Sequence, residues 1–125
     1  MTYLIVFLGG GLGAALRHGV NIAAARLLGT GFPFATMIEN VTGSLAMGLL
    51  AGYFAFRGSG GLQHWQLFLT TGILGGYTTF STFSLDAVLL YERGAVSLAA
   101  LYVLGSVVLS IAGLVAGLAL ARQAF

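Results

Sequence analysis

The sequence predicts an all-α membrane protein with four transmembrane helices. Of its 125 residues, 58% are hydrophobic and only 6% are charged. Twenty glycines stand beside a single proline, a composition more typical of membrane helices than of a small soluble core. The apolar residues form four runs, each long enough to cross a hydrocarbon layer of ~30 Å.

The four predicted spans are joined by short connections. They cover about residues 3–28, 34–56, 64–92 and 96–121. Because the connections are only a few residues long, we expect residues 1–125 to form a single four-span domain. The first span has neither the basic lead nor the small-residue cleavage pattern of a signal peptide, so we expect it to be retained. The predicted location is the cell inner (plasma) membrane, with lipid as a partner.

Composition also excludes several kinds of function. The chain has no cysteine, which excludes disulfides and thiolate metal sites. Two histidines and three acidic residues provide no Ser/His/Asp arrangement, paired carboxylates or metal-ligand spacing, so we expect no enzyme. The five basic residues are all arginine and form no cluster, so we expect no nucleic-acid binding.

The third span contains the most unusual stretch, residues 75–84, with the sequence GGYTTFSTFS. Two adjacent glycines each cost ~1 kcal/mol relative to alanine in a helix. The hydroxyl side chains that follow compete for backbone hydrogen bonds. We therefore expect the third helix to be broken at mid-membrane, near residues 75–79. Non-helical backbone at that depth is tolerated only beside protein or a polar cavity, and its carbonyls can hold a small cation.

The distribution of arginine predicts an unusual orientation in the membrane. Arg57 and Arg122 lie on the side of the termini, and Arg26 and Arg93 lie on the opposite side. Topology normally follows an excess of positive charge on the cytoplasmic side. Since neither side has an excess, we expect dual topology and an antiparallel homodimer as the functional unit.

Polar side chains recur at helical spacing within two spans. Tyr102, Ser106 and Ser110 follow one another every four residues on the fourth span. Aligned serines either bond their own i−4 carbonyls or form a shared polar track, and both interpretations stay open. Asn40 on the second span should face protein or water, because lipid cannot satisfy its amide. It either lines a pore or makes an interhelical hydrogen bond.

Two charged residues lie inside spans. Glu39 is about six residues into the second span, ~9 Å deep by helical rise. A carboxylate there is either functional or solvated by a water-filled vestibule. Arg17, inside the first span, offers five donors and either anchors the structure or attracts an anion.

These features resemble the Fluc (CrcB-type) fluoride channel family over essentially the whole chain. The similar motifs are GGLGAALR at residues 10–17, NVTGS at residues 40–44 and, most specifically, the stretch at residues 75–84. The resemblance implies a fluoride-selective channel that exports fluoride passively and lowers its intracellular concentration. It also implies an antiparallel dimer with two pores and a central, structural sodium ion.

The resemblance further implies roles for individual residues. The sodium ion would be held by the backbone carbonyls of Gly75 and Thr78. The ion pathway would be lined by six residues, namely Asn40, Phe80, Phe83, Tyr102, Ser106 and Ser110.

Three positions depart from the family pattern. Glu39 stands where the family usually has an apolar residue, Tyr77 lies within the break, and His18 follows the arginine. The alternative class of protein is a small proton-coupled multidrug exporter with four spans. Such exporters use a carboxylate in the first span, and this chain has none there. A purely structural subunit would leave the hydroxyl and phenylalanine face unexplained.

Overall fold

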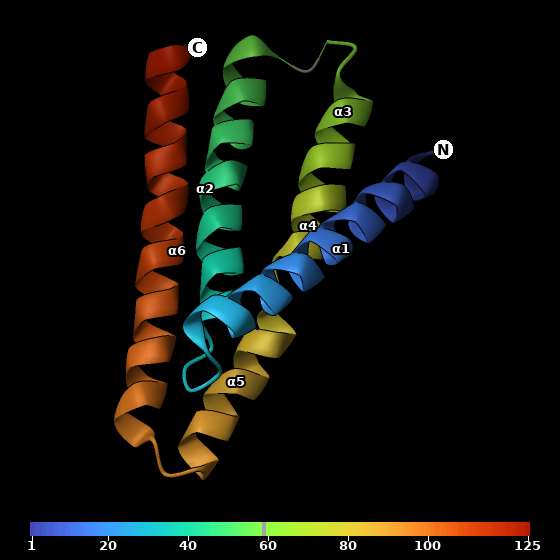
Figure 1. Ribbon diagram of the computed structural model, residues 1–125. Coiled ribbons are helices and arrows are strands. Elements are labelled where there is room, and N and C mark those ends of the chain that lie inside the picture. Colours follow the sequence, from blue (N-terminus) through green and yellow to red (C-terminus); the bar gives the residue numbers. More distant parts are fainter. Residues whose placement is uncertain (59) are drawn as a thin grey trace.

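The computed structural model describes residues 1–58 and 60–125, and these residues contain helices but no strand. Four helical segments are long and apolar enough to cross a membrane, namely Thr2–Leu28, Phe34–Arg57, Gln63–Glu92 and Val96–Ala124. The prediction of four apolar membrane helices is therefore confirmed. Both termini lie at the same end of the molecule (Figure 1), as an even number of spans requires.

Three of the four spans are continuous helices, and the third is divided. Helices α1 (Thr2–Leu28), α2 (Phe34–Arg57) and α6 (Val96–Ala124) run without interruption. The third span begins with three short elements, α3 (Gln63–Leu67), the π-helical η1 (Phe68–Leu74) and α4 (Gly75–Tyr77). It resumes as α5 (Phe80–Glu92) after a break of two residues.

Helices α2 and α6 lie side by side along most of their length (Figure 1). Their backbones touch because small residues face one another. A Cβ atom added at Gly48 would collide with the carbonyl oxygen of Leu114, and one added at Gly117 would collide with that of Leu45. Small residues allow this close approach of membrane helices, so larger residues at these positions would force α2 and α6 apart.

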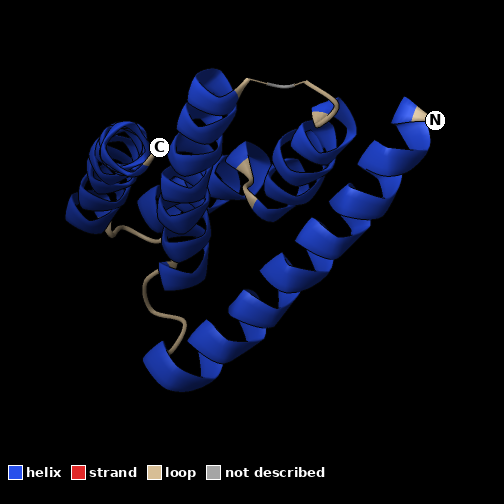
Figure 2. Ribbon diagram, turned by 90° about the horizontal axis from the view of Figure 1, so that it is seen from above, coloured by secondary structure: helices blue, strands red, loops and turns tan. Residues whose placement is uncertain are grey.

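Helix α1 crosses the third span obliquely (Figures 1 and 2). The contact again runs through glycines. A Cβ atom at Gly9 would lie 2.9 Å from the Cα of Gly72, and one at Gly76 would collide with the carbonyl oxygen of Gly10. The first half of the third span is therefore fixed against α1.

The second half of the third span packs on α6 through a small apolar core. Phe83 and Leu90 of α5 and Ala99 and Tyr102 of α6 are buried together. Large apolar side chains elsewhere are exposed, including Leu101, which is 61% exposed on α6. Such an outer surface fits lipid or a second protein chain better than water.

Candidate ion pathway

The break in the third span occupies Thr78 and Thr79. Their backbones are extended, with φ −83° and ψ 156° at Thr78 and φ −153° and ψ 123° at Thr79. The break thus falls within the predicted residues 75–79, but Gly75 and Gly76 are helical rather than part of it. The prediction that these glycines interrupt the helix is therefore wrong at Gly76. The missing side chain of Gly76 instead lets α1 pack closely against the third span.

Side chains from α1 and α2 replace the helical hydrogen bonds lost at the break. Asn40 forms a pair of bonds with Thr79. Its Oδ1 accepts from the Thr79 amide at 2.8 Å, and its Nδ2 donates to the Thr79 carbonyl at 3.0 Å. Arg17 donates from Nε to the Gly76 carbonyl at 3.0 Å. Arg17 therefore anchors the break, and Asn40 makes an interhelical bond at the edge of the pocket described below.

The backbone carbonyls of Gly75 and Thr78 lose the amide donors that they would have in a continuous helix. In an uninterrupted helix, the amides of Thr79 and Thr82 would donate to the carbonyls of Gly75 and Thr78. The Thr79 amide instead bonds Asn40, and the Thr82 amide donates to the Thr79 hydroxyl at 3.2 Å. The Thr79 hydroxyl thus caps α5. The carbonyls of Gly75 and Thr78, which the family resemblance implies as cation ligands, are left without those helical donors.

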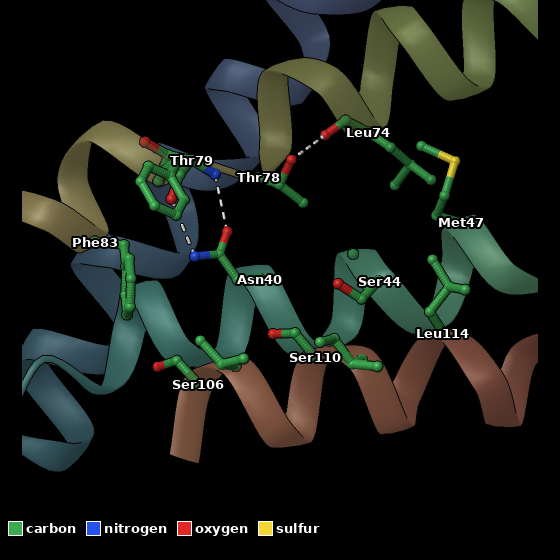
Figure 3. Close-up of a pocket in the computed structure, with 14 residues that line it drawn as sticks. Asn40, Ser44, Met47, Leu74, Thr78, Thr79, Phe83, Ser106, Ser110 and Leu114 are labelled. Carbon is green, nitrogen blue, oxygen red and sulfur yellow. Dashed lines mark hydrogen bonds between the residues drawn. The ribbon is translucent and has the colours of Figure 1, made fainter. Parts of the chain in front are cut away.

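A pocket of about 420 Å³ lies beside the break, between α2, α5 and α6 (Figure 3). It brings together five of the six predicted pathway residues, Asn40, Phe80, Phe83, Ser106 and Ser110. Figure 3 shows Asn40 reaching from α2 towards Thr79, with Ser106 and Ser110 presented by α6. Residues from three spans thus surround one cavity next to the broken backbone.

The polar side chains that line the pocket are neutral, and one of them is buried without a hydrogen-bond partner in the part of the chain that the structure describes. Ser106 is 4% exposed, and its hydroxyl has no hydrogen-bond partner among the described residues. A buried polar group without a partner costs ~1–3 kcal/mol. Ser106 is therefore a residue of the pocket lining whose hydroxyl is unpaired within the described part of the single chain. Ser44, Thr78 and Thr79 add three further hydroxyl groups to the lining.

The two phenylalanines differ in how firmly they are held. Their ring centroids are 5.4 Å apart and the ring planes are tilted by 54°. Phe83 is 8% exposed and packs on Tyr102 with centroids 5.2 Å apart. Phe80 is 77% exposed within the single chain, although it also lines the pocket. One ring is therefore fixed by the core, and the other is largely exposed on the surface of the single chain.

Comparison with known proteins identifies the family. The sequence profile of the family described as "CrcB-like protein, Camphor Resistance (CrcB)" matches residues 4–118. The chain belongs to the CrcB family. It is 73% identical over 122 residues to "Fluoride-specific ion channel FluC" of Rhodopseudomonas palustris (strain BisB5), with 98% of each chain covered. It is 66% identical over 123 residues to "Fluoride-specific ion channel FluC 2" of Nitrobacter hamburgensis, again with 98% of each chain covered.

Tyr102 does not line the pocket of this CrcB-family chain, although it was predicted as a pathway residue. It is 0% exposed, and its hydroxyl donates to Oδ2 of Asp86 at 3.0 Å. Phe83 covers one side of its ring, and Phe32 packs on it edge-on with centroids 5.6 Å apart. Helical spacing placed Tyr102 in line with Ser106, but it could not show that neighbouring aromatic rings close over the tyrosine.

Glu39 is buried within the chain. Its side chain is 1% exposed, and its Oε1 has no hydrogen-bond partner among the described residues. Within the single chain, other side chains cover Glu39, which its depth along α2 could not show, and solvation by a vestibule stays a prediction. An intramembrane carboxylate without a direct partner is by default a functional candidate.

Proposed function

We propose that this CrcB-family protein is a fluoride-selective channel that lets fluoride leave the cell down its own gradient. The single observation that carries the proposal is the pocket in which Asn40, Ser106, Ser110, Phe80 and Phe83 meet. The names of the relatives, as fluoride-specific ion channels, support fluoride as the transported ion.

The chemistry of the pocket suits a small, strongly hydrated anion. Hydroxyl and amide groups can replace water around fluoride by donating hydrogen bonds. They carry no permanent charge, so they do not trap the ion. The edge of a phenyl ring is positive and can also face an anion, while its apolar body keeps the passage narrow.

The functional unit we propose is an antiparallel homodimer. Phe80 supports it, because a pathway residue that is 77% exposed needs a second surface to enclose an ion. The even division of Arg26, Arg57, Arg93 and Arg122 between the two sides supports insertion in both orientations. An antiparallel pair would bring the pocket of each copy against an inverted partner.

We further propose that a structural sodium ion sits at the dimer centre. The carbonyls of Gly75 and Thr78 would hold it, because their helical donors are diverted to Asn40 and to the Thr79 hydroxyl. Unwound carbonyls are suitable ligands for a monovalent cation within a membrane. When bound, the ion supplies positive charge that stabilises two facing helix breaks.

Serine variants test whether fluoride uses this pocket. Ser106→Ala removes the free hydroxyl, and a hydrogen bond to a charged group contributes ~1.5–3 kcal/mol, so we expect fluoride flux to fall about tenfold or more. Ser97→Ala is the matched control, because Ser97 is exposed at the start of α6 and does not line the pocket. Flux would be measured with a fluoride electrode in proteoliposomes. Equal flux in Ser106→Ala and the control would exclude the pocket as the pathway.

A further inference from the structure

Tyr77 and Thr42 form a hydrogen bond that the pathway described above does not use. The Tyr77 hydroxyl lies 2.9 Å from Oγ1 of Thr42. The Thr42 hydroxyl also lies 2.6 Å from the carbonyl of Ile38, to which it donates. Because a threonine hydroxyl has one proton, Tyr77 donates to Thr42 in this arrangement. Tyr77 is the last residue of α4, immediately before the break.

The ring of Tyr77 is seated on α2 as well. A Cβ atom at Gly43 would lie 3.3 Å from Cδ1 of Tyr77 and would collide with the methyl group of Thr78. On the other side, a Cβ atom at Gly13 of α1 would lie 2.9 Å from the Tyr77 amide nitrogen. The half-buried Tyr77 thus contacts two helices, its ring touching α2 at Gly43 and its backbone touching α1 at Gly13.

Hydrogen bonds to α2 hold the residues on both sides of Thr78. After Thr78, the backbone of Thr79 is held by two bonds to Asn40. Before Thr78, the side chain of Tyr77 is held by Thr42. Each residue has only two soft backbone dihedrals, so fixing both neighbours restricts the direction of the Thr78 carbonyl.

We propose that Tyr77 and Thr42 are a positioning pair that orients the carbonyls of the break for a cation and links that site to the fluoride pathway through α2. The inference rests on the proposed sodium site. Thr42, Gly43 and Asn40 lie within one turn of α2, so a shift of the break relative to Thr42 also shifts it relative to Asn40.

A double-mutant cycle tests the pair. Tyr77→Phe removes the hydroxyl but keeps the ring on Gly43, and Thr42→Val removes the acceptor at constant shape. The control for the second change is Thr70→Val, because the Thr70 hydroxyl donates to the i−4 carbonyl of Gln66 at 2.7 Å but contacts no tyrosine hydroxyl. The control for the first is Tyr53→Phe, on α2 away from the break.

The measurements are fluoride efflux against sodium concentration, with the thermal unfolding midpoint recorded for every variant. We expect each single variant to raise the sodium concentration for half-maximal flux about fivefold, the effect of one hydrogen bond. Flux at saturating sodium should stay within about twofold of wild type. In the double variant, the sodium concentration for half-maximal flux should rise no further than in either single variant. Thr42→Ser, which keeps the hydroxyl, should respond to sodium like the wild type.

Three outcomes would overturn the inference, and they distinguish failure of the positioning pair from failure of the cation site. If wild-type flux depends on sodium but the Tyr77 and Thr42 variants show the same sodium dependence as the controls, only the positioning pair is refuted. Additive shifts in the double variant would also refute only that pair, because the two residues would then act separately. Wild-type flux that is independent of sodium would instead refute the proposed cation site, and the positioning pair with it.

Discussion

Asn40 and Thr79 exchange two hydrogen bonds across the space between α2 and the broken third span. The amide of Asn40 takes the place of a neighbouring peptide group, because it accepts from the Thr79 nitrogen and donates to the Thr79 oxygen. The extended backbone at the break is thereby satisfied within the membrane, where each unpaired polar group is costly. The same side chain reaches the pocket, so the helix break and the proposed pathway share one residue.

Replacement of Asn40 should therefore affect both stability and conduction. Asn40→Ala leaves the amide and carbonyl of Thr79 unpaired, at ~1–3 kcal/mol for each group. We expect a clear fall in the thermal unfolding midpoint together with loss of fluoride flux. Asn40→Gln keeps the amide but moves it by one methylene, and should lose most of the flux as well. An unfolding midpoint equal to wild type in Asn40→Ala would show that Thr79 finds other partners.

Replacement of Phe80 or Phe83 should reduce fluoride flux, and replacement of Phe83 should also reduce stability. We expect Phe80→Ile and Phe83→Ile each to lower fluoride flux about tenfold, ~1.4 kcal/mol, because the positive ring edges are lost. Phe83→Ile should also lower the unfolding midpoint, since Phe83 is 8% exposed in the core. Phe7→Ile is the matched control for Phe80, because Phe7 is 75% exposed on α1. Wild-type flux in both variants would mean that the rings only pack.

Added positive charge should separate the two orientations. Gly60→Lys with Gln63→Lys adds one lysine to the loop after Arg57 and one at the start of α3, and the positive-inside rule then favours that end of the molecule on the cytoplasmic side. We expect one orientation to predominate and flux to fall, because inverted partners become scarce. Orientation would be measured by labelling single cysteines introduced into the cysteine-free chain.

A complementary variant provides the control for topology. Thr30→Lys with Ser97→Lys adds the same charge to the opposite side of the chain. Expressed alone, each charged variant should conduct poorly, and expressed together they should recover flux. Full activity of either variant alone, with its single orientation confirmed by labelling, would contradict the antiparallel dimer.

Removal of the buried carboxylate should increase conduction. A negative charge ~8 Å from an anion opposes it by about 2 kcal/mol at an effective dielectric near 20, so Glu39→Gln should raise fluoride flux about thirtyfold near neutral pH. The variant should also show a flatter dependence of flux on pH. Glu92→Gln is the control, because Glu92 is exposed at the end of α5. Unchanged flux would place Glu39 outside the pathway, and complete loss would make the carboxylate a required part of it.

Much of the fold follows from the sequence, because long apolar runs cross a membrane as helices and the hydroxyl residues after Gly76 indicate a break near residues 75–79. Helical spacing aligns Ser106 with Ser110, whereas the roles of Asn40, Phe80 and Phe83 came from the family resemblance. Gly76 was misread because helix propensity is a local quantity, whereas its contact with Gly10 depends on how α1 crosses the third span. The contact between Asn40 and Thr79 could not be derived either, since it depends on the register between two separate helices.

Fluoride efflux from proteoliposomes tests whether this protein moves fluoride passively. The wild-type protein would be reconstituted in sodium-containing buffer, and efflux of fluoride and of chloride would be compared without and with an imposed proton gradient. We predict fast fluoride efflux without a proton gradient, no comparable chloride efflux, and no dependence on the gradient beyond its effect on membrane potential. Fluoride efflux that requires the proton gradient would contradict a channel and favour a coupled exporter.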